Sequence, residues 1–280
     1  MPASMVRLVV LTLLLSSLVG ACASTGERLI PWYVTRRIAS YLDLTSAQKK
    51  DARVVVDDTL HVLRRSEIPH WIDLLREIRG AVHDGLDDAR IARLQAKYDA
   101  RLDAGVALLA PRLARLLTQL DAGQLDHFAE RMREDVEAQY DELTLPPRER
   151  GPEIEKRALK VLRKEVGSLS DAQEDAVRAL IRALPNERVK QHASALDHIA
   201  RFRAFLAVRR SDAEIASTLS AMWDHRYDAL GVGRDKTARR AEQRAWLLGV
   251  YRLLTSTQRA HVEAQITERI EMLKRFAVIE

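Results

Sequence analysis

Helix-breaking and chemically reactive residues are scarce in this sequence. Its 280 residues include 11 glycines, 8 prolines and one cysteine, and aromatic side chains make up only 5%. A single cysteine excludes an internal disulfide, so packing has to stabilise the fold. Low glycine and proline content, together with abundant Ala, Leu, Arg and Glu, favours helices. The length allows one large domain or two smaller ones, each with its own core.

Recognisable catalytic and metal-binding motifs are also missing from the sequence. The eight histidines form no HExxH pattern, and no second cysteine completes a Cys–His site. Neither GxSxG, nor a P-loop, nor a glycine-rich dinucleotide turn occurs. Asp57 and Asp58 are adjacent, so on a helix they diverge by about 100° and cannot work as a carboxylate pair. We therefore expect no enzyme activity, no cofactor and no metal site.

Neither sign of charge dominates, because 45 basic residues against 40 acidic ones leave a net charge of +5. Several basic residues occur in pairs, such as Arg36–Arg37 and Arg239–Arg240. Nucleic acid is one use for such pairs, but the leader described next argues against it, and we expect no nucleic-acid partner. Anionic lipid head groups or acidic stretches of client proteins fit better, and solvated helix faces are the alternative.

The N-terminus has the form of a secretory leader. Arg7 supplies a positive charge, and a largely apolar run of eleven residues follows from Leu8 to Leu18. A membrane-spanning helix needs about 20 residues, so this run is too short to span a bilayer. It fits the hydrophobic part of a signal peptide, and residues 1–21 are the predicted leader.

The leader ends in Leu-Val-Gly-Ala-Cys at residues 18–22. This segment resembles the lipobox of bacterial lipoproteins, which is cleaved between the residues that correspond to Ala21 and Cys22. The resemblance implies acyl chains on Cys22, which would hold the protein at a membrane. Because Ala23 rather than Asp follows, it also implies the inner leaflet of the outer membrane, with the protein facing the periplasm. Two or three acyl chains together anchor firmly, since each buried CH₂ adds about 0.8 kcal/mol.

The rest of the chain has apolar residues at spacings of three and four, which predicts an all-α, multi-helix fold. Pro69 fits the first turn of a helix. Pro111 lies inside a helical pattern and is expected to kink or split it near Ala110. The segment 143–152, with three prolines and a glycine, is the clearest predicted linker. The predicted helices cover residues 31–42, 45–64, 69–84, 87–120, 121–142, 152–167, 170–183, 186–210, 211–230, 235–254 and 255–278.

One five-residue motif occurs four times, beginning at Leu44, Leu120, Leu169 and Leu254. Each copy has a Thr, Ser or Asp after the leucine and a Gln three residues later. This is the pattern of a capping box, in which the first side chain and the Gln satisfy each other's backbone N–H groups. The predicted capping residues are Thr45, Gln48, Asp121, Gln124, Ser170, Gln173, Thr255 and Gln258.

The motifs also suggest an internal duplication, since 125 residues separate Leu44 from Leu169. At the same offset, residues 88–104 resemble residues 212–229. The matching charges are Asp99, Arg101 and Asp103 in the first copy and Asp224, Arg226 and Asp228 in the second. These charges could bind a ligand in both halves, or they could form salt bridges between helices. We favour the salt bridges.

The resulting domain prediction has five segments. After the leader come a lipidated N-terminus with a short aromatic helix, a first helical repeat, a linker with a connecting helix, and a second repeat. Their expected ranges are 1–21, 22–43, 44–143, 144–168 and 169–280.

Two families share these features. The lipobox followed by Tyr41-Leu42-Asp43-Leu44-Thr45 and Gln48 resembles a family of uncharacterised proteobacterial helical lipoproteins. More distantly, the paired motifs resemble the periplasmic LTxxQ family, which includes Spy and CpxP. That resemblance implies an all-helical body, a concave face for unfolded clients or a role in envelope stress, and the content of a dimer in one chain. Asp121 and Ser170 depart from the Leu-Thr pattern, although they can still cap.

These observations predict a non-catalytic binding lipoprotein of the outer membrane, chaperone-like or related to envelope stress. The alternative is a structural or accessory lipoprotein that docks a folded envelope partner. A cell-wall hydrolase would require a deep pocket with converging carboxylates. The sequence leaves the oligomeric state open. An open, basic, partly apolar groove between the two halves would favour the binding role over the accessory role.

Overall fold

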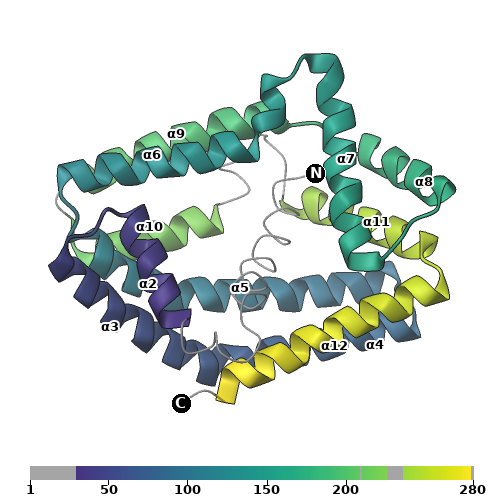
Figure 1. The fold of residues 1–280 in the computed structure, drawn as a ribbon, viewed down its shortest axis with the longest axis horizontal. Helices are drawn as coiled ribbons and strands as arrows, with labels where there is room; N and C mark the ends of the chain where they lie inside the picture. The colour runs from purple at the N-terminus through teal and green to yellow at the C-terminus, as the bar shows by residue number, and fades with distance from the viewer. Residues whose placement is uncertain (1–29, 209, 226–235, 279–280) are drawn as a thin grey trace.

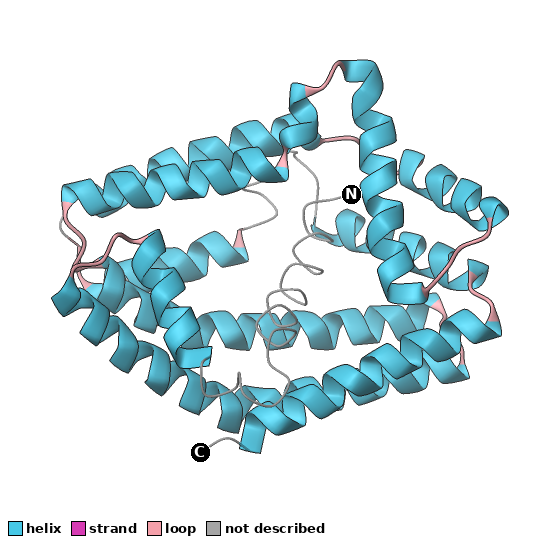
Figure 2. Ribbon diagram, in the orientation of Figure 1, coloured by secondary structure: helices cyan, strands magenta, loops and turns pink. Residues whose placement is uncertain are grey.

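A computed structural model describes residues 30–208, 210–225 and 236–278. Within these ranges helices are the only regular elements (Figure 2), which confirms the predicted all-α class. No helix in the described part of the chain is long and apolar enough to cross a bilayer. Four residues with predicted roles lie outside the described residues: Ala21, Cys22, Arg226 and Asp228.

The first unit contains a short N-terminal helix and two long helical rods. A single π-helical turn, η2, joins α3 to α4, and Pro69 lies in the first turn of α4 as predicted. The helices are α2 (Ile30–Tyr41), α3 (Ser46–Val62), η2 (Leu63–Glu67), α4 (Ile68–Asp84), α5 (Asp88–Leu117) and α6 (Ala122–Gln139).

The rest of the chain repeats this order, with the equivalent of α5 in two pieces. A 3-10 turn, η3, precedes the connecting helix α7, and α10 and α11 together take the place of α5. The elements are η3 (Asp141–Thr144), α7 (Pro147–Val166), α8 (Asp171–Arg182), α9 (Arg188–Ala207), α10 (Asp212–Asp224), α11 (Lys236–Leu253) and α12 (Ser256–Val278).

The structure excludes one of the two outcomes predicted for Pro111, a split helix, and the predicted proline-rich linker was wrong. Pro111 does not split its helix, because α5 continues through it from Asp88 to Leu117. The proline ring is exposed while Ala110 and Ala114 on either side are buried, so packing holds the helix and the freed carbonyl faces water. The expected linker 143–152 is mostly helical, because α7 begins at Pro147, where a proline suits the first turn, and continues past the exposed Pro152.

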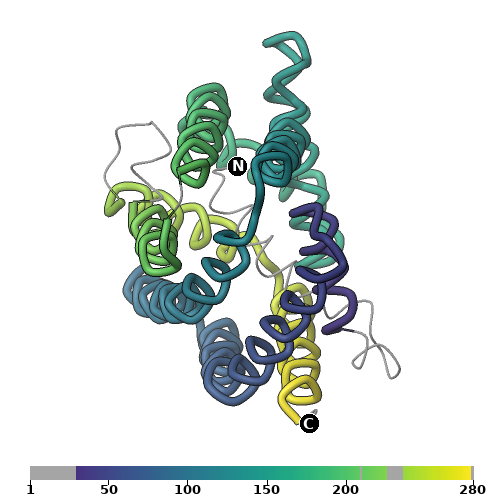
Figure 3. Tube along the Cα trace, turned by 90° about the vertical axis from the view of Figure 1, so that its left-hand side faces the viewer, coloured from purple at the N-terminus to yellow at the C-terminus, as the bar shows by residue number. Residues whose placement is uncertain are grey.

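The two predicted units do not fold as separate bodies. Helix α4 of the first unit packs against α12 of the second, and α6 of the first packs against α9 of the second (Figures 1 and 3). Helix α5 packs against both α10 and α11. The boundaries at 143 and 169 therefore mark a repeat in the sequence but not separate structural domains. Helices of the two halves pack against each other.

The hydrophobic cores follow the same interleaving. One cluster joins Leu44 and Leu117 of the first half to Phe202 and Ile215 of the second. Another joins the apolar face of α4 to Tyr251 and to the buried face of α12. Only the cluster between α7, α8 and α11 lies on one side of the repeat boundary. Each half therefore completes its core with side chains from the other.

Candidate functional site

The four repeated motifs meet in two pairs, and the first pair joins the starts of α3 and α6. The amides of Gln48 and Gln124 bond to each other in both directions, with N–O distances of 3.1 and 2.7 Å. Gln124 also donates to the carbonyl of Asp43 at 2.7 Å, and Gln48 donates to that of Gln119 at 2.8 Å. Thr45 and Asp121 form their capping boxes at the same time.

The second pair repeats these contacts between α8 and α12. Gln173 donates to Gln258 at 2.8 Å and Gln258 donates back at 3.2 Å. Their amides also reach the carbonyls of Leu253 and Ser168, each of which directly precedes a motif leucine. Ser170 and Thr255 cap the two helices. We call each arrangement a glutamine clasp: Gln48 with Gln124, and Gln173 with Gln258.

The repeated charges are used mainly for packing. Asp99 forms an ion pair with Arg240 of α11, and Asp103 accepts a bond from the indole of Trp223 at 2.7 Å. Arg101 lies 3.7 Å from Glu67. Their partners lie on other helices, in agreement with interhelical bridges rather than a ligand site.

The second copy of the charge motif is described only in part, and its one described member is exposed. Asp224 ends α10 on the surface, while the remaining two residues of the copy lie outside the described ranges. The packing role of these charges is therefore observed for the first copy, Asp99, Arg101 and Asp103.

The other candidate groups are likewise dispersed. Asp57 and Asp58 bind different arginines, Arg53 and Arg112, at 2.8 and 3.0 Å. Among the residues that the structure describes, no three His, Cys, Asp or Glu side chains gather as metal ligands would. Of the basic pairs, Arg239 and Arg240 are buried against Glu187 and Asp99. They are therefore not available to an external partner.

An open apolar groove lies between helices of the two halves. We call it the α2 groove; α2, the C-terminal part of α5, α6, α9 and α10 form its walls. Its volume is about 450 Å³, within the range of about 300–1,000 Å³ typical of ligand sites. The residues that define it here are Tyr33, Leu113, Met132, Phe202, Leu219 and Met222.

Aromatic rings in edge contact form part of the groove wall. The ring of Phe128 lies 5.9 Å from that of Tyr41 and 6.4 Å from that of Phe202, centroid to centroid. Leu116 and Leu117 of α5 also line the groove and are almost fully buried. Methionine and leucine side chains complete the lining, and methionine adapts easily to different apolar shapes. The groove can therefore accept apolar groups of varied outline.

Polar contacts hold α2 to α6 at the edge of the groove. The hydroxyl of Tyr41 donates to Asp135 at 2.6 Å, and a ring nitrogen of His127 lies 3.0 Å from the carbonyl of Ser40. Burial, and next the bond to Asp135, raise the pKa of Tyr41 well above its ordinary value, so it stays a neutral donor. Arg37 is the only charged side chain in the described lining, which offers no carboxylate for acid–base chemistry.

The equivalent place in the second half is filled. Helix α7 precedes the third motif as α2 precedes the first, and the 125-residue offset aligns them. The inward positions of α7 carry buried aliphatic residues that pack on Trp246 and Val250. In α2 three of the four aligned positions carry larger or charged side chains, the fourth carries Val34, and all four stay partly exposed. The pairs are Tyr33 with Ala158, Val34 with Leu159, Arg37 with Leu162 and Tyr41 with Val166.

Comparison with known families matches residues 40–227, about two thirds of the chain, to a family of unknown function, DUF6279. The chain belongs to this family. The expectation of an uncharacterised family is thereby confirmed at that level. No curated protein and no solved structure matches the chain.

The DUF6279 match spans α3 to α10, so it contains the first glutamine clasp and most walls of the α2 groove. Sequence reasoning found the clasp residues but missed the groove. One sequence feature could have indicated the groove. Where α7 has aliphatic residues, the aligned positions of α2 have Tyr33, Arg37 and Tyr41. That exchange becomes visible only after the two helices are aligned through their motifs.

Proposed function

We propose that this protein is a lipoprotein of the outer membrane, anchored through Cys22, that holds apolar segments of unfolded envelope proteins in the α2 groove. The observation that carries the proposal is the groove itself, which lies between the halves and is open, largely apolar and edged by Arg37. Its openness and apolar lining favour a binding role over an accessory one, and Arg37 alone supplies basic charge in the described lining.

The chemistry of the lining suits unfolded polypeptide better than one defined small molecule. Its leucine, methionine and aromatic side chains offer contact area without a set of fixed polar groups. Sites for a specific ligand usually carry a few precisely placed polar groups, which fix its orientation. The polar side-chain groups in the described lining of the α2 groove are Arg37 and the hydroxyls of Tyr33 and Tyr41, and the Tyr41 hydroxyl is already bonded to Asp135.

The position of α2 fits a tether at the membrane. Only seven residues lie between Cys22 and Ile30, and an extended chain spans these eight residue steps in at most about 28 Å. Trp32 is 51% exposed on α2, and the guanidinium of Arg36 lies over its ring at 5.3 Å. An exposed tryptophan beside arginines suits the head-group region of a bilayer. In this arrangement the groove would open close to the membrane.

Two leucines at equivalent positions allow a matched test of the groove. Leu113 lies in the groove seven residues before the second motif, and Leu247 lies seven residues before the fourth, outside the groove lining. Both are 39% exposed. Because both are at the surface, Leu113→Gln and Leu247→Gln should change the free energy of unfolding by no more than about 0.5 kcal/mol.

The test measures suppression of aggregation of an unfolded client at a near-equimolar ratio, with the chain from residue 23 onward. The wild type and Leu247→Gln should suppress aggregation equally, and Leu113→Gln should suppress it several-fold less. Failure of the wild type at low and moderate salt would contradict the binding role. Stable co-purification with one folded partner would support the accessory role instead.

The anchor is tested separately by mass spectrometry of the protein purified from its native membrane. The expected mature chain begins at Cys22 and carries acyl chains. An intact N-terminus, or an unmodified Cys22 on a cytosolic product, would contradict the proposed location.

A further inference from the structure

Two side chains in the lining of the α2 groove have donors that are free to bind a ligand. Tyr33 and Arg37 are four residues apart on α2, so they lie on one face of the helix with Cβ atoms about 5–6 Å apart. Both are exposed, and Tyr33 is 47% exposed. Within the described part of the chain, no hydrogen bond or ion pair engages the hydroxyl of Tyr33 or the guanidinium of Arg37. A ligand in the groove can therefore reach both groups.

These two donors together suit a carboxylate. A guanidinium has N–H donors and no acceptor, and it binds a carboxylate through two parallel hydrogen bonds. A phenol hydroxyl can donate one more bond to the same oxygens. Apart from the Tyr41 hydroxyl, the rest of the described lining is apolar. A ligand that uses the whole groove therefore needs an apolar part with a carboxylate next to it.

The neighbouring charges leave this pair of donors available. Helix α2 carries two arginines and no acidic residue. On α6, Arg131 pairs with Glu134, and Asp135 accepts the hydroxyl of Tyr41 at 2.6 Å. These three charged residues of α6 do not belong to the described lining. Arg37 is therefore the charge that a ligand in the groove contacts.

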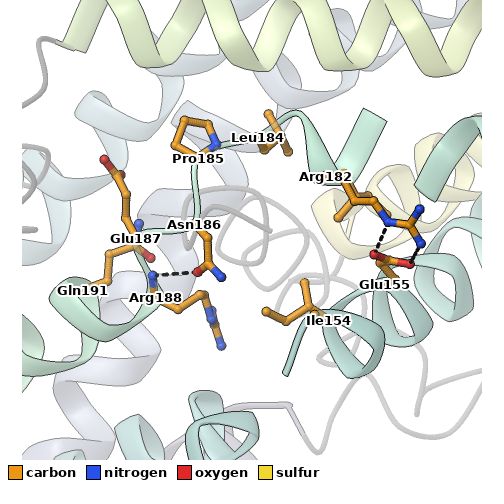
Figure 4. Close-up of a pocket in the computed structure, with 11 residues that line it drawn as sticks. Ile154, Glu155, Arg182, Leu184, Pro185, Asn186, Glu187, Arg188 and Gln191 are labelled. Carbon is orange, nitrogen blue, oxygen red and sulfur yellow. Dashed lines mark hydrogen bonds and ion pairs between the residues drawn. The ribbon is translucent and has the colours of Figure 1, made fainter. Parts of the chain in front are cut away.

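A smaller pocket, between α7, α8 and the loop that leads into α9, differs in this respect (Figure 4). There Arg182 binds both oxygens of Glu155 at 2.8 and 2.9 Å, and Arg188 donates to Glu142 at 2.5 Å. A charged ligand would have to compete with these existing partners. Of these two pockets, the α2 groove is the one that offers an uncommitted positive charge.

The repeat shows that the two donors are not needed for packing. The residues of α7 that align with Tyr33 and Arg37 are Ala158 and Leu162, and both are buried in the core of the second half. The same helix position therefore packs with apolar side chains where no groove opens. Changes to Tyr33 or Arg37, which are exposed, should accordingly leave the fold intact.

We propose that the α2 groove selects apolar polypeptide segments that carry a carboxylate beside the apolar run, with Arg37 and the Tyr33 hydroxyl as its donors. This inference rests on the proposed function, because it names which clients the groove prefers. An acidic side chain and the end of a client chain present the same carboxylate, so either source fits. A basic residue at that place is disfavoured by its like charge.

The probes are four dansyl-labelled peptides with one apolar core, Leu-Phe-Ala-Leu-Phe. Three end in Glu, Gln or Lys with an amidated C-terminus, and the fourth ends in Gln with a free carboxylate. Glu and Gln have nearly the same shape, so the ratio of their Kd values isolates the charge. Fluorescence anisotropy measures each Kd against the whole mature chain, residues 22–280.

The wild type should bind at least one of the two carboxylate peptides about five-fold more tightly than the amidated Gln peptide. The Lys peptide should bind more weakly than the Gln peptide. Salt at about 0.5 M should reduce these differences, because it screens exposed charges. A gain with the Glu peptide assigns the carboxylate to a side chain, and a gain with the free C-terminus assigns it to a chain end.

Two neighbouring arginines allow a matched comparison. Arg37→Gln should remove the preference for the carboxylate peptides. Arg36→Gln makes the same change in net charge one residue away, but the guanidinium of Arg36 lies over the ring of Trp32 at 5.3 Å and is not in the described lining. It should keep the preference. Tyr33→Phe retains the ring and should reduce the preference about two-fold.

The outcomes separate this inference from the proposed function. The inference is overturned if the wild type binds both carboxylate peptides within two-fold of the amidated Gln peptide. It is also overturned if Arg36→Gln and Arg37→Gln lose the preference equally, because the charge would then act at long range. In either case binding of the Gln peptide would still support the apolar groove. Binding of no peptide would contradict the proposed function and this inference together.

Discussion

The clasp glutamines each perform two roles with one amide group. The oxygen of Gln124 accepts from the backbone N–H of Asp121, while its nitrogen donates to Asp43 and Gln48. Asp43 presents its carbonyl from a backbone with φ of 48°, a left-handed conformation that Asp tolerates better than most residues. A capping box accepts Glu or Gln equally, but only an amide can also donate across to the other helix.

Replacing Gln124 by Glu therefore separates the clasp from the cap. At neutral pH, Gln124→Glu keeps a capping acceptor but loses the donor to Asp43 and sets a carboxylate against the oxygen of Gln48. We expect it to lower the free energy of unfolding by about 1–3 kcal/mol. Chemical denaturation at pH 7 measures the change.

The matched control is Gln119→Glu, because the side chain of Gln119 is exposed and only its backbone carbonyl enters the clasp. It should change stability by less than about 0.5 kcal/mol. As pH falls, the deficit of Gln124→Glu should shrink, since the protonated acid regains a donor. An equal loss in both variants, or a deficit that grows as pH falls, would show that the clasp does not depend on the donated bond.

At the scale of helices, the sequence predicted starts better than ends and interruptions. Helix starts are local, because Thr45 and Gln48 satisfy each other within one turn, and these were located correctly. The helices continue through Pro111 and through most of the 143–152 segment because residues far away in the sequence pack against them. The local sequence pattern contains no information about that packing. The π-helical turn between α3 and α4 likewise has no local signal that we can identify.

Close packing of two helices gives a second prediction at this scale. A Cβ at Gly249 of α11 would lie 2.9 Å from Leu180 of α8, whereas one at Gly105 of α5 meets nothing within 4 Å. Gly105→Ala should stabilise the protein by about 0.5–1 kcal/mol through helix propensity. Gly249→Ala should fall short of that gain by at least about 1 kcal/mol, because Leu180 must move. Thermal unfolding compares them, and equal gains would contradict the close approach.

At the scale of the whole molecule, the interleaved cores predict that neither half folds alone. Residues 30–143 leave Leu117 without Phe202 and Ile215, and leave the apolar face of α4 without α12. We expect this fragment to unfold without a cooperative transition, and likewise the fragment 144–280. Mixing the two should restore helicity and a single transition by circular dichroism. A cooperative transition in either fragment alone would contradict this prediction.

The candidate sites mark the limit of what the sequence could predict. The motifs identified which residues begin helices and how the copies pair. The α2 groove is lined by residues as far apart in the sequence as Tyr33 and Met222. No local spacing encodes this arrangement, so it required the folded structure.

The closure of α12 onto α4 has a consequence for how the chain reaches its native state. Arg79 bonds to Thr267 across 188 residues of sequence, and the two helices share a core. Loops this long close slowly compared with local helix formation. During synthesis, the apolar face of α4 therefore stays uncovered until nearly all of the remaining chain, up to α12, has been made. A newly made copy would spend that interval dependent on other factors to keep it from self-association.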